Sequence, residues 1–310
     1  MKTCPFFGVC GGCKFDFAAP DYREKKLREI SSLPLTGDAV WTDVGTRRRA
    51  DFAFADGVFG FYQHRSKNIV PVQMCPLLRP EINALLPALR ALPWGGAGSC
   101  LVTVCDNGID ISIDANVPYF SSDFRAAAER LQNVIRVTWG GRTVMMRATP
   151  TVTFDGHTVE FPPNAFLQPT VPSERALRDM VVDAARSARR VAVLFCGLGN
   201  FTFALNADGF DIAGTGTRRD LNTHPLTTGM LAQYDCVVMD PPRAGAYAQC
   251  KVLANSNVSR IIYVSCNPAT WRRDANVLQR GGYELKTLIP VDQFVGSAHW
   301  ELFSIFDRAA

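Results

Sequence analysis

From residue 173 onward, the hydrophobic and polar positions follow two alternating patterns. Apolar residues recur at helical spacing over 173–188, behind Ser173 as the expected N-cap. A continuous apolar run, Val191–Phe195, then turns at Cys196-Gly-Leu-Gly-Asn200 into another helix. Continuous apolar strands that alternate with helices are typical of a parallel sheet buried on both faces. We therefore predict an α/β, Rossmann-like domain over 161–310.

Two further apolar strands in this half each end in a polar turn. The strand that begins at Asp235 runs into Asp240-Pro-Pro-Arg243, and the strand that begins at Arg260 runs into Ser265-Cys266-Asn267-Pro268. In an open α/β sheet, ligands bind beyond the carboxyl ends of the strands. An aspartate and a cysteine delivered to that edge therefore indicate a site rather than packing.

The first half of the chain has shorter elements. We expect a charged helix over Asp21–Ile30, a β-hairpin within 46–72 and an apolar helix over 81–92. Strands with one helix near 121–133 follow. The pattern predicts an N-terminal α+β domain over 1–160, and the Pro-rich stretch after it is the expected domain boundary.

Composition adds limits to this picture. A chain of 310 residues is long enough for two domains, and 47% hydrophobic with 20% charged residues is ordinary for a globular protein. No apolar run reaches the roughly 18 residues of a membrane span. No signal peptide is recognisable, so we expect a cytoplasmic protein without structural disulfides. The net charge of +4 permits nucleic-acid binding without requiring it.

The N-terminus carries a group of cysteines with the spacing of a ligand-binding loop. Cys4, Cys10 and Cys13 are close in sequence, with glycines between the last two, and Cys75 could supply a fourth thiolate. Four thiolates suit a [4Fe–4S] cluster or a structural zinc ion. The wide first spacing favours the cluster, and buried thiols without a ligand are the alternative.

Together these motifs resemble the S-adenosylmethionine-dependent RNA uracil-5 methyltransferases over nearly the whole chain. The resemblance is carried by Asp240-Pro-Pro-Arg243, Ser265-Cys266-Asn267-Pro268 and His299-Trp-Glu301. The four cysteines are similar to those of the branch that modifies 23S rRNA and contains a [4Fe–4S] cluster. The resemblance implies a class I methyltransferase domain, S-adenosylmethionine and the cluster as cofactors, and RNA, with 23S rRNA favoured, as the partner. It implies neither a membrane nor an obligate protein partner.

The resemblance also implies roles for individual residues. Cys266 would attack carbon 6 of a flipped-out uridine, Glu301 would remove the proton from carbon 5, and Asp240 would face the base. The residues that it assigns to S-adenosylmethionine are Gln168, Phe195, Gly197, Asn200, Asp220 and Asp240. Scattered basic residues, among them Arg47-Arg-Arg49, are the expected phosphate contacts.

The cofactor side departs from the family pattern. Val193 replaces the usual aspartate, and the stretch Asp211–Thr217 has no acid at the position expected to hold the ribose. Only 34 residues separate Asn200 from Asp235, whereas the usual elements need about 50–60. We therefore expect a deletion of one βα unit and weak binding of S-adenosylmethionine. The alternatives are an RNA-binding relative with impaired catalysis, a tRNA uridine methyltransferase, and a zinc-bearing methyltransferase that acts on DNA or protein.

Overall fold

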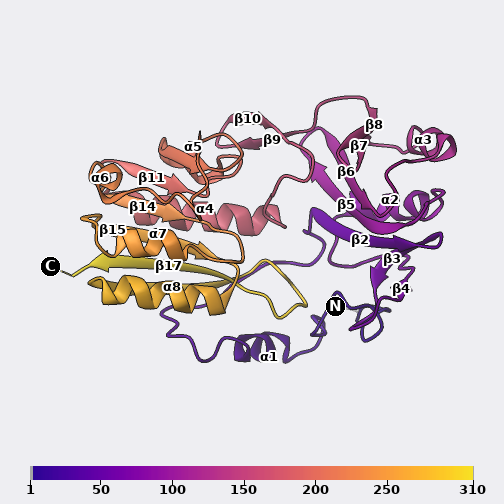
Figure 1. The fold of residues 1–310 in the computed structure, drawn as a ribbon. Coiled ribbons are helices and arrows are strands. Elements are labelled where there is room, and N and C mark those ends of the chain that lie inside the picture. Colours follow the sequence, from indigo (N-terminus) through magenta and orange to yellow (C-terminus); the bar gives the residue numbers. More distant parts are fainter. Residues whose placement is uncertain (1–2, 310) are drawn as a thin grey trace.

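Two large sheets organise the computed structural model, which describes residues 3–309 (Figure 1). A seven-stranded sheet belongs to the N-terminal half of the chain, and an eight-stranded sheet contains the strands of the C-terminal half. No helix within residues 3–309 combines the length and the apolar character that crossing a bilayer requires.

The N-terminal sheet has the strand order β4-β3-β2-β5-β6-β7-β8 and is antiparallel except for the pair β6–β7. Its core contains a group of packed aromatic rings, in which Phe54 and Phe59 both stack on Trp94. The hairpin predicted within 46–72 is present as β2 and β3. The elements are β2 (Arg49–Ala55), β3 (Val58–Tyr62), β4 (Ile69–Val70), α2 (Pro80–Arg90), β5 (Ala97–Cys105), β6 (Gly108–Ala115), α3 (Ser122–Ala128), β7 (Val134–Trp139) and β8 (Arg142–Met146).

The C-terminal sheet has the strand order β1-β16-β17-β15-β14-β11-β12-β13. The strands β12, β11, β14 and β15 are parallel, and β17 is inserted antiparallel between β15 and β16. This arrangement confirms the predicted α/β class. The elements are α4 (Val171–Ala185), β11 (Val191–Leu194), α5 (Asn200–Leu205), β12 (Asp208–Asp211), β13 (Thr217–Arg218), α6 (Thr228–Leu231), β14 (Cys236–Met239), α7 (Tyr247–Leu253), β15 (Arg260–Ser265), α8 (Pro268–Arg280), β16 (Tyr283–Asp292) and β17 (Glu301–Arg308).

The middle strands of this sheet are covered on both faces. Successive side chains of a strand point to opposite faces, and all four residues of β14 are buried. Val237 and Met239 belong to the cluster that contains residues of α7 and α8, whereas Val238 belongs to the cluster that contains α4. The continuous apolar runs in the sequence therefore reflect a sheet that lies between two layers of helices.

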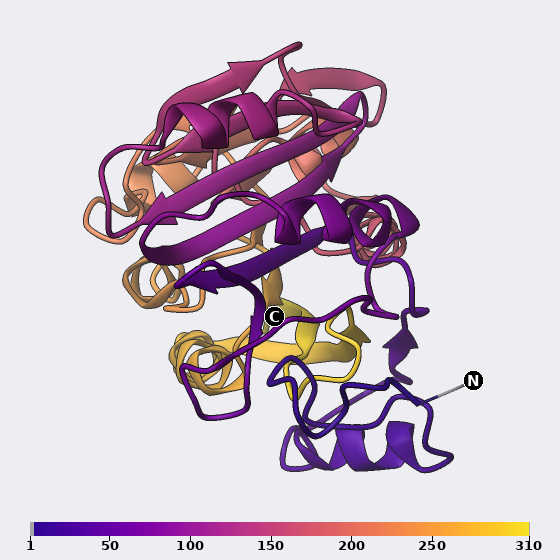
Figure 2. The same ribbon diagram turned by 90° about the vertical axis from the view of Figure 1, so that its right-hand side faces the viewer.

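The first elements of the chain lie with the C-terminal sheet. β1 (Val40–Trp41) pairs in parallel with β16. Both views place α1 (Tyr22–Arg28, indigo) beside the yellow C-terminal elements (Figures 1 and 2). Ile30 and Leu33, just after α1, are part of the same core cluster as α7 and α8. The seven-stranded sheet is therefore built from a segment that lies, in sequence, between two parts of the other sheet.

A small two-stranded sheet connects the two large sheets in sequence. It consists of β9 (Thr151–Phe154) and β10 (His157–Glu160). The ring of His157 stacks on Phe203 of α5 with a centroid distance of 4.5 Å. The expected boundary near residue 160 thus lies where the chain already contacts the C-terminal domain.

Candidate active site

Three of the predicted catalytic residues lie at one edge of the C-terminal sheet. Asp240 follows β14 and Cys266 follows β15, and these strands are parallel neighbours, so both residues lie at their carboxyl ends. Glu301 begins β17, which runs antiparallel to β15 with Leu302 opposite Ser265. The start of β17 therefore lies beside the end of β15. Topology brings a thiol and two carboxyl groups together from three separate motifs.

Burial and nearby negative charges raise the pKa values of all three acidic groups. Burial raises the pKa of Cys266 to about 12, and the negative charges of Glu301 and Asp240 add to this effect. Burial raises the pKa of Asp240 to about 7, with a further contribution from Asp211. Burial and the charge of Asp240 raise the pKa of Glu301 well above its ordinary value. The site therefore favours partly protonated states near neutral pH.

Each of the two carboxyl groups is paired with a glutamine. Gln168 Nε2 donates a hydrogen bond to Asp240 Oδ2 over 3.2 Å, and Gln293 Nε2 donates one to Glu301 Oε2. Gln168 Oε1 is buried and has no hydrogen-bond partner among the described residues, so it is free to bind a ligand. Gln293 was missed in the sequence because only tertiary pairing brings it to Glu301. The one available signal was its polar character at the end of an apolar strand.

The segment that carries Gln168 is held by arginines that the sequence assigned to RNA. Arg48 is 5% exposed, forms an ion pair with Glu174, and donates from Nε to the carbonyl of Gln168 over 2.9 Å. Arg49 donates from Nη1 to the carbonyl of Leu167 over 2.9 Å. The prediction of a phosphate contact is wrong for Arg48, because its guanidinium is buried and already paired.

Helix α4 begins earlier than the sequence pattern indicated. Thr170, not Ser173, is the N-cap, and its hydroxyl accepts a hydrogen bond from the backbone N–H of Ser173. Pro172 fits the first turn, where no N–H is needed for the helix. The side chain of Ser173 is consequently inside the first turn and 1% exposed.

The predicted glycine turn lies between β11 and α5. Phe195, Gly197 and Gly199 all have positive φ values, of 59°, 51° and 99°. A non-glycine residue such as Phe195 adopts this conformation only at a cost, which is common at ligand sites. Asn200 is the first residue of α5. The backbone of the turn therefore has the tight geometry expected for a nucleotide-binding loop.

An acid does stand at the end of the second strand. Asp211 is the last residue of β12, and β12 is the parallel neighbour of β11. Its Oδ2 accepts a hydrogen bond from the N–H of Gly197 over 2.8 Å. The expectation that this strand lacks an acid is wrong, because β12 ends at Asp211 itself. Asp211 is thus a candidate ribose ligand, currently bonded to the glycine turn.

The deletion expected after this strand is visible in the topology. β12 and β13 are parallel neighbours joined by residues 212–216 without a helix. Parallel neighbours ordinarily need a crossover of about a dozen residues or more. This short loop folds back on the glycine turn: Thr215 N donates to Gly197 O over 3.1 Å, and a Cβ on Gly214 would lie 1.9 Å from the same oxygen. The loop therefore covers part of the backbone predicted to receive the methyl donor.

Asp220, predicted to lie near the adenine, follows β13. Its carboxylate accepts hydrogen bonds from Asn222 N over 3.0 Å and from Thr223 Oγ1 over 2.8 Å. These bonds lower the pKa of Asp220. The residue stabilises its own turn in this structure.

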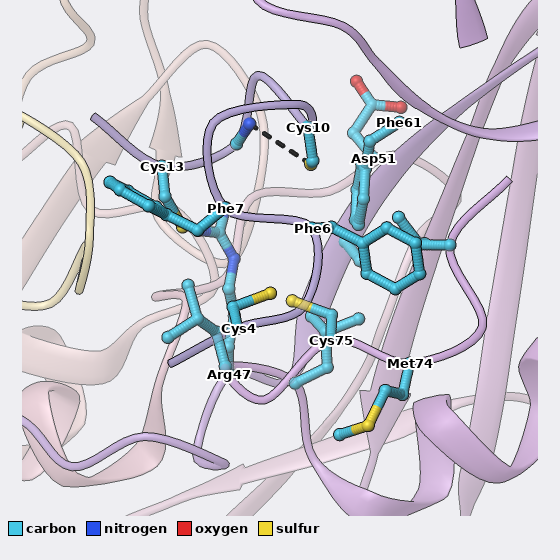
Figure 3. Close-up of a pocket in the computed structure, with 15 residues that line it drawn as sticks. Cys4, Phe6, Phe7, Cys10, Cys13, Arg47, Asp51, Phe61, Met74 and Cys75 are labelled. Carbon is cyan, nitrogen blue, oxygen red and sulfur yellow. Dashed lines mark hydrogen bonds between the residues drawn. The ribbon is translucent and has the colours of Figure 1, made fainter. Parts of the chain in front are cut away.

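The four predicted thiol ligands line one cavity of about 220 Å³ between the N-terminal loop and the segment around Cys75 (Figure 3). The sulfurs of Cys4 and Cys75 point toward each other. Among residues 3–309, no three metal-ligating side chains gather tightly enough for a single ion. A zinc ion would need its thiolates about 2.3 Å from one point. The structure thus brings the four thiols to one cavity.

Comparisons with known proteins match this chain along most of its length. The family model described as tRNA (Uracil-5-)-methyltransferase matches residues 214–308. An uncharacterized RNA methyltransferase of Caulobacter vibrioides is 35% identical, over 99% of this chain and 86% of its own length. A 23S rRNA (uracil(1939)-C(5))-methyltransferase of Edwardsiella ictaluri is 28% identical, over 99% and 82%. The crystal structure of the Pyrococcus abyssi tRNA (uracil-54, C5)-methyltransferase with S-adenosyl-L-homocysteine has a TM-score of 0.75 and 18% identity, over 92% and 82%.

The match to the Caulobacter protein also bears on the shortened segment. It extends over 356 positions, whereas this chain has 310 residues, so at least 46 positions have no counterpart here. The loss of the helix between β12 and β13 agrees with this difference in length.

Proposed function

Because this chain belongs to the RNA uracil-5 methyltransferase family, we propose that it methylates carbon 5 of a uridine in 23S rRNA through a covalent Cys266 adduct. The observation that carries the proposal is the meeting of Cys266, Asp240 and Glu301 at one sheet edge. The likeness to the Edwardsiella enzyme over nearly the whole chain supports 23S rRNA as the substrate. The likeness to the Pyrococcus tRNA enzyme is one of fold.

The chemistry requires that carbon 5 of uracil become a nucleophile. Cys266 gives up its proton, its sulfur bonds to carbon 6, and the electrons of the carbon 5–carbon 6 double bond move into an enolate. S-adenosylmethionine supplies an electrophilic methyl group to carbon 5. Glu301 then takes the proton from carbon 5, the double bond forms again, and the carbon 6–sulfur bond breaks with its electrons returning to Cys266.

Asp240 is suited to hold the pyrimidine. Its pKa of about 7 lets the carboxyl group donate a hydrogen bond when protonated or accept one when ionised. Gln168, whose Nε2 already donates to Asp240, keeps Oε1 free for a ligand. We assign the contacts of the methyl donor to Phe195, Gly197 and Asn200 of the turn, to Asp211, which bonds to Gly197, and to Gln168, which bonds to Asp240.

The N-terminal cavity is proposed to hold a [4Fe–4S] cluster on Cys4, Cys10, Cys13 and Cys75. Support comes from the four thiols that line one cavity. Anaerobically purified protein should contain iron and inorganic sulfide in equal amounts. Zinc without iron would contradict this assignment.

The test of the main proposal is capture of the covalent adduct. RNA that carries 5-fluorouridine cannot lose its substituent from carbon 5, so the adduct with Cys266 should accumulate and be visible by mass spectrometry. Cys266→Ala should abolish it. Cys250→Ala is the matched control, because Cys250 is a fully buried thiol of α7 outside the site.

The choice of RNA is tested in the same system. Labelled methyl groups from S-adenosylmethionine should enter 23S rRNA and not tRNA, and mapping should place them on carbon 5 of one uridine. If the label enters tRNA alone, tRNA and not 23S rRNA is the substrate. If the adduct still forms in Cys266→Ala, Cys266 is not the nucleophile.

One observation favours a second candidate function, RNA binding with impaired methyl transfer. The loop 212–216 covers the glycine turn and bonds to Gly197. The complete set of Cys266, Asp240 and Glu301 favours catalysis instead. Calorimetric titration with S-adenosylmethionine decides between them, since no measurable binding would support the second function.

A further inference from the structure

A buried chain of hydrogen bonds connects the start of α4 to Glu301. Ser173 Oγ donates to Gln293 Oε1 over 3.2 Å, and Gln293 Nε2 donates to Glu301 Oε2. Ser173, Gln293 and Glu301 are 1%, 1% and 2% exposed, so water does not compete for these bonds. Thr170 Oγ1 lies 2.5 Å from Ser173 Oγ and extends the chain by one hydroxyl.

This chain determines which end of the Gln293 amide meets Glu301. Ser173 Oγ lies 3.2 Å from two acceptors, Gln293 Oε1 and the carbonyl oxygen of Thr170, and the Thr170 hydroxyl can donate to it in turn. With its oxygen engaged by a donor, the amide presents N–H to Glu301. An N–H stabilises an ionised carboxylate and not a protonated one.

The backbone at Gln293 is fixed by neighbouring groups. Asp292 forms a fully buried ion pair with Lys26 of α1 and accepts a hydrogen bond from Tyr22 Oη over 2.7 Å. These contacts anchor the residue directly before Gln293, and the Gln293 amide itself is held by its bonds to Ser173 and Glu301. The charged and titratable groups on the elements packed around Glu301 are Asp240, Cys266, Lys26, Asp292, Tyr22, His299 and Arg243.

Burial and the charge of Asp240 both favour a protonated Glu301, whereas the hydrogen bond from Gln293 opposes them. A general base must be ionised when its substrate arrives. We propose that Gln293 is a positioning residue that aims the Glu301 carboxyl group at the carbon-5 proton and favours its ionised form, and that Ser173 sets the orientation of the Gln293 amide. This inference rests on the proposed function.

The experiment measures tritium release from RNA that carries uridine tritiated at carbon 5, as a function of pH. Gln293→Leu removes the donor without adding charge. We expect the maximal rate to fall about ten- to a hundredfold and the acidic limb of the profile to move up by about one to two pH units. Gln293→Asn and Ser173→Ala should move the limb in the same direction by less.

A matched control separates the effect on Glu301 from the loss of stability that follows when any buried glutamine is removed. Gln249 is 0% exposed, and its amide bonds to the backbone N–H and carbonyl of Leu226, away from the sheet edge. Gln249→Leu should lower thermal stability as Gln293→Leu does and leave the acidic limb in place.

The 5-fluorouridine adduct distinguishes a failure of the role of Gln293 from a failure of the proposed function. Gln293→Leu should still form the adduct, because Cys266 is intact, while its tritium release is slowed. A slower variant with an unmoved profile, or a limb that moves to lower pH, would overturn the role of Gln293 while the proposed function stands. A wild-type protein that forms neither adduct nor product overturns the proposed function and this inference with it.

Discussion

At the scale of single residues, the site combines groups that oppose one another's ionisation. Cys266 and Asp240 were predictable because each ends a strand that is recognisable from its apolar run. Their shared environment was not predictable, since it depends on which strands become neighbours. Gln293 and Asp211 act through contacts with Glu301 and Gly197 that no local pattern contains.

The half-buried carboxyl group of Asp240 has a consequence for stability. Its pKa is raised to about 7, above the value near 4 of an exposed carboxyl, so the folded chain binds this proton more tightly than the unfolded chain. The resulting stabilisation is present below pH 4 and is lost as the pH rises towards 7. Asp240→Asn should therefore be about 1–3 kcal/mol more stable than wild type at pH 8 and nearly equal at pH 4.

Urea denaturation at the two pH values measures this difference. Asp220→Asn is the control, because Asp220 is exposed and its pKa is lowered by Thr223 and Asn222. That variant should gain nothing at pH 8. An equal gain for Asp240→Asn at both pH values would contradict the explanation from buried charge.

At the scale of elements, the loop between β12 and β13 distinguishes this chain. Counting residues predicted that an element is missing, but not where the remaining chain goes. The contacts of the loop with Gly197 and Cys196 depend on glycines at 214 and 216, whose Cβ atoms would clash with the turn. The loop 212–216 can therefore pack against the glycine turn only with glycine at these two positions.

Gly214→Ala tests whether the loop competes with the methyl donor. The new Cβ would overlap Gly197 O, and Gly214 has a φ of 106°, so the loop cannot keep its present position. We expect S-adenosylmethionine to bind about tenfold more tightly by calorimetry, with a loss of about 1–3 kcal/mol in stability.

Gly156→Ala provides the comparison. Gly156 also has a positive φ, of 80°, but a Cβ there would meet nothing within 4 Å. It should cost stability without changing affinity. Unchanged affinity in Gly214→Ala would show that the loop does not limit access to the turn.

At the scale of the whole molecule, α1 and β1 close one side of the C-terminal sheet. Lys26 is fully buried, pairs with Asp292, and lies 4.9 Å from the ring centroid of Trp300, the neighbour of Glu301. The charged sequence of α1 correctly predicted a helix. It did not predict that Lys26 is buried, because a fully exposed helix would have the same pattern of charges. Its burial depends on a partner more than 250 residues away, at Asp292.

Lys26→Met should be destabilising by about 3–5 kcal/mol, because Asp292 would stay buried without its partner. The double variant Lys26→Met with Asp292→Leu should recover most of this loss, since both charges are then removed. Chemical denaturation measures both. A single variant that loses less than about 1 kcal/mol would mean that the pair is hydrated in solution.

The pairing of β1 with β16 also sets the order of events during synthesis on the ribosome. α1 and β1 emerge before the seven-stranded sheet, and β16, the strand that pairs with β1, is made only from residue 283 onward. α1 and β1 therefore stay unpaired while the seven-stranded sheet is made, until β16 becomes available. The five basic residues in and near α1, Arg23, Lys25, Lys26, Arg28 and Lys14, keep this unpaired segment well hydrated. The nascent chain thus carries in α1 a lysine, Lys26, that is fully buried once the protein has folded.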